Sequence, residues 1–74
     1  MQRPSKPTRK LDVEISNQGT IFLFFLISQE AREWVQENVA EPLWFGNALA
    51  CEARYAPELA YGMITGGLIC EPIR

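Results

Sequence analysis

Histidine is absent from this chain, and cysteine is scarce. Without histidine there is no histidine-based catalytic triad, no histidine general base and no histidine-ligated zinc site. The two cysteines, Cys51 and Cys70, match no metal-binding spacing, and a single pair does not make the disulfide framework of a small secreted protein. We expect two buried free thiols in a reducing compartment, with a disulfide between them as the main alternative.

Long apolar runs are absent as well. The most apolar stretch, residues 21–27, is far shorter than the ~20 residues that a membrane-spanning helix needs. Basic residues precede it, as in a signal peptide, but Asp12 and Glu14 intervene and no small-residue cleavage site follows. We therefore expect a cytoplasmic protein with no membrane segment.

No catalytic signature is found either. The glycines within residues 62–67 lack the lysine and the preceding strand of a phosphate-binding loop. Glu52, Glu58 and Glu71 lie far apart in the chain, and no local feature would separate their pKa values for acid–base work. We expect no catalytic residue, cofactor or metal, and so no enzyme.

The charge is unevenly distributed. The chain has seven basic and nine acidic residues. The first ten residues hold four of the basic ones and no acidic one, so this segment carries +4 and residues 11–74 carry −6. We predict a disordered basic arm over residues 1–10 and a single domain over residues 11–74. The candidate nucleic-acid-binding residues of the arm are Arg3, Lys6, Arg9 and Lys10. A solvated tail is the favoured interpretation, because no aromatic residue is interleaved.

The segment "LDVEIS", residues 11–16, alternates apolar and polar residues, as a half-buried strand does. A turn containing Gly19 follows, and then the run "TIFLFFLIS", residues 20–28. These segments predict an N-terminal β-hairpin. Every residue of the run from 21 to 27 is large and apolar, although a strand covered on one side needs only every second residue to be apolar.

The loop length decides which side chains of this hairpin share a face. With a three-residue loop, Val13 lies opposite Leu23, and the second face carries Phe22, Phe24 and Leu26. A two-residue loop exchanges the two sets. We expect the three-residue loop, with Phe22, Phe24 and Leu26 as the interface of a homodimer and with Asp12 and Glu14 as its polar rim.

The remaining chain predicts two helices and two strands. Ser28 is a suitable N-cap for a helix that runs to about Val39, and Pro57 suits the first turn of a second helix that ends near Gly66. A third strand is predicted over residues 47–53 and a short final strand around Pro72. The order β-β-α-β-α-β predicts an α+β, two-layer sandwich with both helices on one face of the sheet.

The densest cluster of large side chains is "PLWFGNALACEARY", residues 42–55. An aromatic loop beside charged strand residues would suit partner binding. The candidate partner-binding residues are Trp44, Phe45, Glu52, Arg54 and Tyr55. The favoured interpretation is structural: Trp44 and Phe45 cap the core, and Glu52 pairs with Arg54 or Arg32.

Four features follow one another between Ile21 and Leu68: an apolar strand, "AREWVQENV", "WFGNALACEARY" and "LAYGMITGGL". In this order they resemble a group of short, uncharacterised bacterial proteins, many from prophages and other mobile elements. The matching positions are Trp44, Phe45, Gly46, Glu52, Arg54 and Tyr55. The resemblance implies a phage or mobile-element setting and no particular activity.

Together these features predict a non-catalytic protein-interaction module that forms a homodimer. In a mobile-element setting, one concrete form is an accessory protein that binds a host protein through its acidic body. The alternative is a nucleic-acid-binding accessory protein that uses the basic arm, and the acidic body argues against it.

Overall fold

A computed structural model describes residues 10–73 of the chain. The elements, in chain order, are β1 (Val13–Asn17), β2 (Ile21–Leu26), α1 (Gln29–Asn38), β3 (Leu43–Phe45), β4 (Ala48–Glu52), the 3-10 helix η1 (Ala53–Tyr55), α2 (Ala56–Thr65) and β5 (Cys70–Pro72). Of the predicted basic arm, Arg3, Lys6 and Arg9 lie outside the described residues. Lys10 is exposed, with its Nζ 4.0 Å from Glu30.

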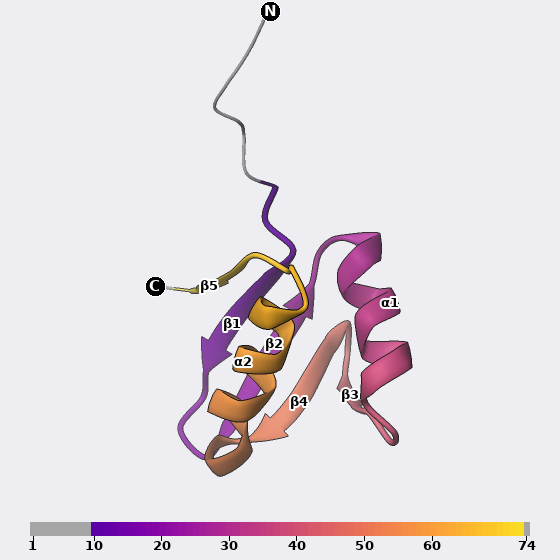
Figure 1. Cartoon of the computed structure of the whole chain (residues 1–74). Coiled ribbons are helices and arrows are strands. Elements are labelled where there is room, and N and C mark those ends of the chain that lie inside the picture. The colour runs from indigo at the N-terminus through magenta and orange to yellow at the C-terminus, as the bar shows by residue number, and fades with distance from the viewer. Residues whose placement is uncertain (1–9, 74) are drawn as a thin grey trace, which may run out of the picture.

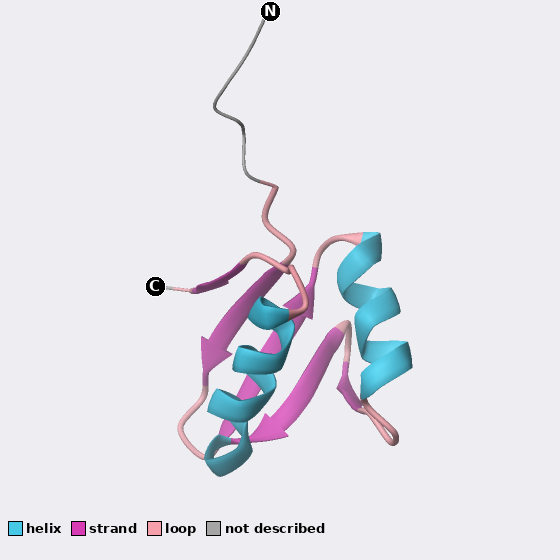
Figure 2. Ribbon diagram, viewed as in Figure 1, coloured by secondary structure: helices cyan, strands magenta, loops and turns pink. Residues whose placement is uncertain are grey.

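The five strands form one mixed sheet in the order β3-β4-β2-β1-β5. The β1–β5 pair is parallel, and the other three pairs are antiparallel. Both helices lie on the same side of the sheet (Figure 1, Figure 2), which confirms the predicted two-layer α+β architecture. The predicted strand order lacked β3, because a three-residue strand is too short to show an alternation of apolar and polar residues.

The first hairpin has a two-residue loop. The Gln18 backbone N–H donates to the Ile21 carbonyl oxygen at 2.9 Å, so only Gly19 and Thr20 lie in the loop. Gly19 has a φ of 94°, which suits the first position of a two-residue β-hairpin loop. The Gly19 N–H also donates to Asn17 Oδ1 at 2.8 Å, which further orders the turn.

The three-residue loop expected from the sequence is therefore wrong, and so is the face it assigned to β2. Ile15 lies opposite Phe24 and Val13 lies opposite Leu26. Because successive side chains of a strand point to opposite faces, Phe22, Phe24 and Leu26 face the helices. Phe24 is fully buried in the core, so it is not available to a partner.

The core lies between the sheet and the helices. Its largest fully buried side chains are Phe24, Leu49, Met63, Val13 and Val35. The N-cap of α1 is Ser28, as predicted, and its Oγ accepts from the Ala31 N–H at 3.0 Å. From α1, Trp34 packs against the end of α2: a Cβ at Gly66 would lie 2.6 Å from the Trp34 Nε1, so this contact requires glycine.

Asp12 ties three segments together at the start of β1. Its Oδ2 accepts from the Ile69 N–H at 2.8 Å, and its N–H donates to the Ile69 carbonyl at 2.9 Å. Its carbonyl oxygen accepts from the Ile27 N–H at 2.8 Å. Asp12 is buried, so the prediction that it forms an exposed polar rim is wrong. It instead joins the loop before α1 to the loop before β5.

The environment of Asp12 favours its charged form. A hydrogen bond from the Ser28 side chain, the Ile69 N–H and the nearby charge of Lys10 hold the pKa of Asp12 below its usual range, although burial acts in the opposite direction. A carboxyl group whose pKa is lower in the folded state adds stability above its unfolded pKa. That stability is lost as the pH falls through the folded pKa.

We predict that Asp12→Asn lowers the free energy of unfolding at neutral pH by about 1–3 kcal/mol, the usual effect of losing hydrogen bonds to a buried charged group. The difference from the wild type should shrink as the pH falls below about 4, where aspartate becomes protonated. Urea unfolding at several pH values measures it. Glu37→Gln, on the exposed side of α1, is the control. A difference that is the same at pH 7 and at pH 3 would contradict the assignment.

Candidate functional site: the open face of the sheet and strand β3

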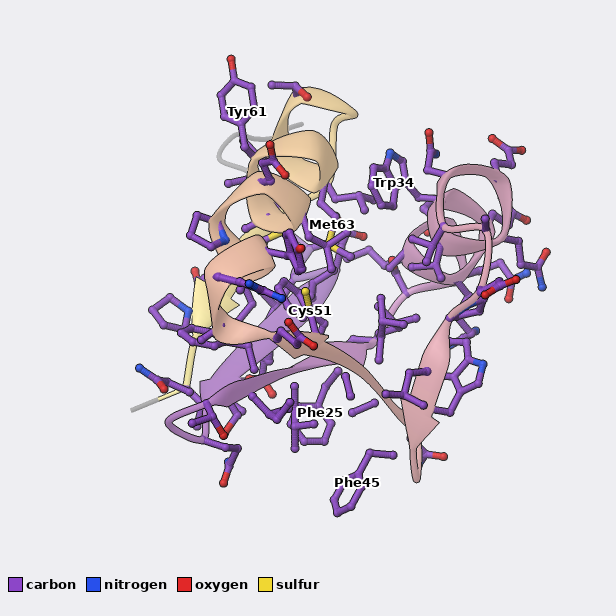
Figure 3. All side chains as sticks on the ribbon, turned by 90° about the horizontal axis from the view of Figure 1, so that it is seen from below. Phe25, Trp34, Phe45, Cys51, Tyr61 and Met63 are labelled. Carbon is purple, nitrogen blue, oxygen red and sulfur yellow. The ribbon has the colours of Figure 1, made fainter. Side chains whose placement is uncertain are left out.

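Within residues 10–73, one face of the sheet has no helix on it, and we call it the open face. In the observed register, the side chains of β2 on this face are Ile21, Leu23 and Phe25. Figure 3 shows Phe25 and Phe45 on the side of the sheet opposite Met63 and Trp34. The prediction that three large apolar side chains of β2 occupy a second face is therefore confirmed, with Ile21, Leu23 and Phe25 in place of the predicted set.

The open face is hollowed along β4. This strand contributes only small side chains beside β2 and β3: Ala48 pairs with both Phe25 and Phe45, and Ala50 pairs with both Leu23 and Leu43. The result is a groove of about 420 Å³ between the larger side chains of the two neighbouring strands. Its lining residues are Gln18, Ile21, Leu23, Leu43, Trp44, Phe45 and Ala50. All of them except Gln18 are apolar, so the groove suits an apolar occupant.

Strand β3 is exposed along its whole length. Leu43 is 67% exposed, Trp44 49% and Phe45 68%. Leu43 and Phe45 extend the open face, whereas the alternation along the strand directs Trp44 to the other side of the sheet. As an edge residue, Trp44 borders both the groove and, with Arg32 of α1, a small hollow on the helix side. The favoured prediction that Trp44 and Phe45 cap the core is therefore wrong. A short edge strand cannot reach over the core, so its side chains remain in solvent.

The polar residues of the predicted partner-binding cluster form a separate group. The Arg54 Nε lies 3.0 Å from Glu52 Oε1, and the Arg54 guanidinium lies 5.0 Å from the centroid of the Tyr55 ring. This group follows the end of β4 beside the first hairpin turn. Trp44 and Phe45 lie at the opposite end of β4, so the structure does not bring the five predicted residues into one site.

The acidic side chains of the open face lie mainly at the edge opposite β3. Glu14 and Glu71 are direct neighbours on β1 and β5, and their register places both on the open face. Like charges on adjacent strands repel one another. Within the described residues, the ion pairs are Lys10–Glu30 and Glu52–Arg54, so neither of these two glutamates takes part in one. The open face is therefore apolar towards β3 and acidic towards β5.

The two cysteines are free, as predicted, but half-buried rather than buried. Both point to the helix side, and β2 and β1 lie between their strands. At ~4.8 Å per strand, the two residues lie at least roughly 14 Å apart, and Cys51 is level with Asn17 of β1 whereas Cys70 is level with Val13, so they are too far apart for a disulfide. Burial raises the pKa of the Cys51 thiol, and the charge of Glu52 adds to this. Burial and then the charge of Asp12 raise the pKa of Cys70. Both thiols are therefore protonated and unreactive at neutral pH.

The second large hollow lies between the helices and above β4. It has a volume of about 470 Å³ and is lined by Trp34, Leu49, Cys51, Leu59 and neighbouring residues. Its walls are mainly apolar, and its only thiol is the unreactive Cys51. Over residues 10–73 the structure has no group of three side chains that could hold a metal ion. No helix in that range is long and apolar enough to cross a membrane.

The comparisons with known proteins find no relative for this chain. No protein-family model, no curated protein and no solved structure matches it. The resemblance to mobile-element proteins therefore remains a prediction from the sequence. The functional assignment rests on the surfaces of the structure itself.

Sequence reasoning missed that Ile21, Leu23 and Phe25 lie on the open face, where Leu23 is only 9% exposed, and that Leu43 is a surface residue. The first three were placed on the wrong face by the loop length, and Gly19 was the signal that could have corrected it. A glycine followed by one further residue suits a two-residue loop, because its positive φ matches the twist of the flanking strands. Leu43 was missed because β3 itself was read as a loop.

The two phenylalanines of opposite burial give a direct test of this surface. We predict that Phe24→Ala costs about 3–5 kcal/mol of unfolding free energy, because it leaves a cavity in the core. Phe45→Ala should change it by less than about 0.5 kcal/mol, because its side chain is mostly in solvent. Chemical unfolding at low protein concentration measures both, with Phe24→Leu as a milder core variant. Equal costs for Phe24→Ala and Phe45→Ala would contradict the assigned faces.

Proposed function

We propose that this protein is a non-catalytic protein-interaction module that acts as a homodimer. The observation that carries the proposal is the exposed apolar strand β3, together with the apolar groove beside it on the open face. Three consecutive large hydrophobic residues, each about half exposed or more, are unusual on a small monomer, and contiguous apolar patches of this kind mark interaction sites.

The chemistry of the described residues supports binding rather than catalysis. The thiols are protonated, and Arg54 is engaged by Glu52 and Tyr55. By contrast, aromatic side chains such as Trp44 and Phe45 are the residues that contribute most to binding at protein interfaces. A domain of this size also gains stability from a second subunit, because its own core is small.

The N-terminal segment of the same chain does not suit the apolar surface. Residues 1–9 contain no aliphatic or aromatic residue except Met1. They offer few apolar side chains to cover Leu43 and Phe45. An apolar surface outside this chain is therefore the better partner for Leu43 and Phe45, and a second copy of the chain supplies one.

The acidic side of the open face supports a further role for the dimer. Glu14 and Glu71 lie side by side, and residues 11–74 carry −6. Such a surface attracts basic partners and repels nucleic acid. An accessory protein that binds a basic surface of a host protein fits this charge, whereas nucleic-acid binding through the arm stays a prediction outside the described residues.

Sedimentation equilibrium of the full chain over a range of concentrations tests the proposal. We predict a reversible monomer–dimer equilibrium for the wild type. Phe45→Asp should shift it to monomer, because it places a charge in the apolar surface. The matched control is Tyr61→Asp, since Tyr61 is 70% exposed on α2, on the helix side of the sheet. Circular dichroism checks that both variants fold.

A wild type that stays monomeric up to ~1 mM, the concentration at which even weak complexes form, would overturn the homodimer. Equal weakening by Phe45→Asp and Tyr61→Asp would show that the dimer uses a different surface from the one proposed.

A further inference from the structure

The two edges of the sheet differ in how they are protected against pairing with another strand. At one edge, β5 carries Glu71 and Pro72, and both charge and proline discourage the addition of a further strand. At the other edge, β3 carries neither a charge nor a proline within Leu43–Phe45. It is protected by its shortness and by Pro42, which lies just before it and has no N–H to offer a partner strand. The β3 edge is therefore the one that can accept a partner strand.

The geometry of the second hairpin determines which backbone groups of β3 are free. Phe45 pairs with Ala48 across the two-residue turn Gly46–Asn47, so this pair exchanges hydrogen bonds. Hydrogen-bonded and non-hydrogen-bonded pairs alternate along an antiparallel ladder. The next pair, Trp44 with Leu49, is therefore the non-bonded one. The N–H and carbonyl of Trp44 point away from β4, to the free edge.

We propose that two copies of the chain join β3 to β3 in antiparallel orientation, with Trp44 opposite the partner's Trp44 on the two-fold axis. This deepens the proposed function, on which it rests, because it states how the homodimer forms. The two Trp44 residues exchange both N–H to carbonyl hydrogen bonds. The two five-stranded sheets then become one continuous sheet, with all the helices on one side.

The side chains of β3 are complementary to themselves in this register. Leu43 lies opposite the partner's Phe45, and Phe45 lies opposite the partner's Leu43, all on the open face. The two Trp44 indoles meet on the other side of the joined sheet. Residues 42–51 contain no charged residue, so no like charges face each other across this pairing. Every exposed side chain of β3 thus finds an apolar partner.

The buried area indicates how tight such a dimer is. At the exposures of Leu43, Trp44 and Phe45, each side chain has roughly 100–150 Å² to bury, so the three contribute at most roughly 300–450 Å² per copy. Stable interfaces bury about 1,200–2,000 Å² in total, and smaller ones are weak or transient. The dimer should therefore dissociate on dilution, with a dissociation constant in the micromolar range or above.

Disulfide trapping tests the pairing. In a background with Cys51→Ala and Cys70→Ala, Trp44→Cys should cross-link into a dimer under mild oxidation. Directly opposite residues of a hydrogen-bonded pair have Cα atoms about 5.5 Å apart, within disulfide range. Phe45→Cys in the same background is the matched control. In this register its two copies lie roughly 8 Å apart, beyond that range.

A second measurement uses the wild-type chain and avoids the loss of the indole. Amide exchange of Trp44 should slow about two- to fourfold between ~50 µM and ~1 mM, because the monomer fraction of a dimer equilibrium falls at most with the square root of the concentration. The exchange of Tyr61 should not change with concentration.

The outcomes separate the two proposals. Cross-linking at Trp44→Cys, together with concentration-dependent protection of the Trp44 amide, supports the edge pairing. Preferential cross-linking at Phe45→Cys, or a dimer in sedimentation without protection of Trp44, overturns the edge pairing and leaves a dimer that uses another surface. A wild type that is monomeric throughout overturns both the edge pairing and the homodimer.

Discussion

The hydrogen bond between the Gln18 N–H and the Ile21 carbonyl is the constraint on which the rest of the structure depends. It closes the first hairpin with a two-residue loop and so decides the face of every β2 side chain. In this register Phe24 enters the core, where it packs with residues of both helices. A change of register by an odd number of residues would place Phe24 in solvent and Leu23 beneath the helices, and the core would have to be rebuilt.

Because β2 is the central strand and apolar on both faces, one side of the sheet can form the core while the other carries the interaction surface. The helix side forms the core and is closed at its end by Asp12, which ties together the loops before α1 and β5. The open face has no such cover from the described part of the chain. Strand β3 extends its apolar part to a less protected edge, whereas the opposite edge carries Glu71 and Pro72. The β3 edge can therefore pair with another strand, whereas the charge and the proline of β5 make pairing at its edge unfavourable.

Most of the architecture follows from local signals in the sequence. The alternation in residues 11–16, the N-cap Ser28 and the Pro57 in the first turn of α2 predict the hairpin and both helices. The predictions failed where the outcome depends on one or two residues. The loop length turns on the conformation of Gly19, and β3 is too short for a periodic pattern. The exposure of Trp44 and Phe45 depends on where the sheet ends, and no local pattern in the sequence contains that information.

The register of the first hairpin is tested most directly by nuclear Overhauser effects between backbone Hα protons of the wild-type chain. These protons are close together only in the non-hydrogen-bonded pairs of an antiparallel ladder. The two-residue loop predicts strong Hα–Hα effects for Ile15 with Phe24 and for Val13 with Leu26. Effects for Ile15 with Ile21 and for Val13 with Leu23 would contradict it, because they would place Phe24 on the open face and remove the basis for the assigned interaction surface.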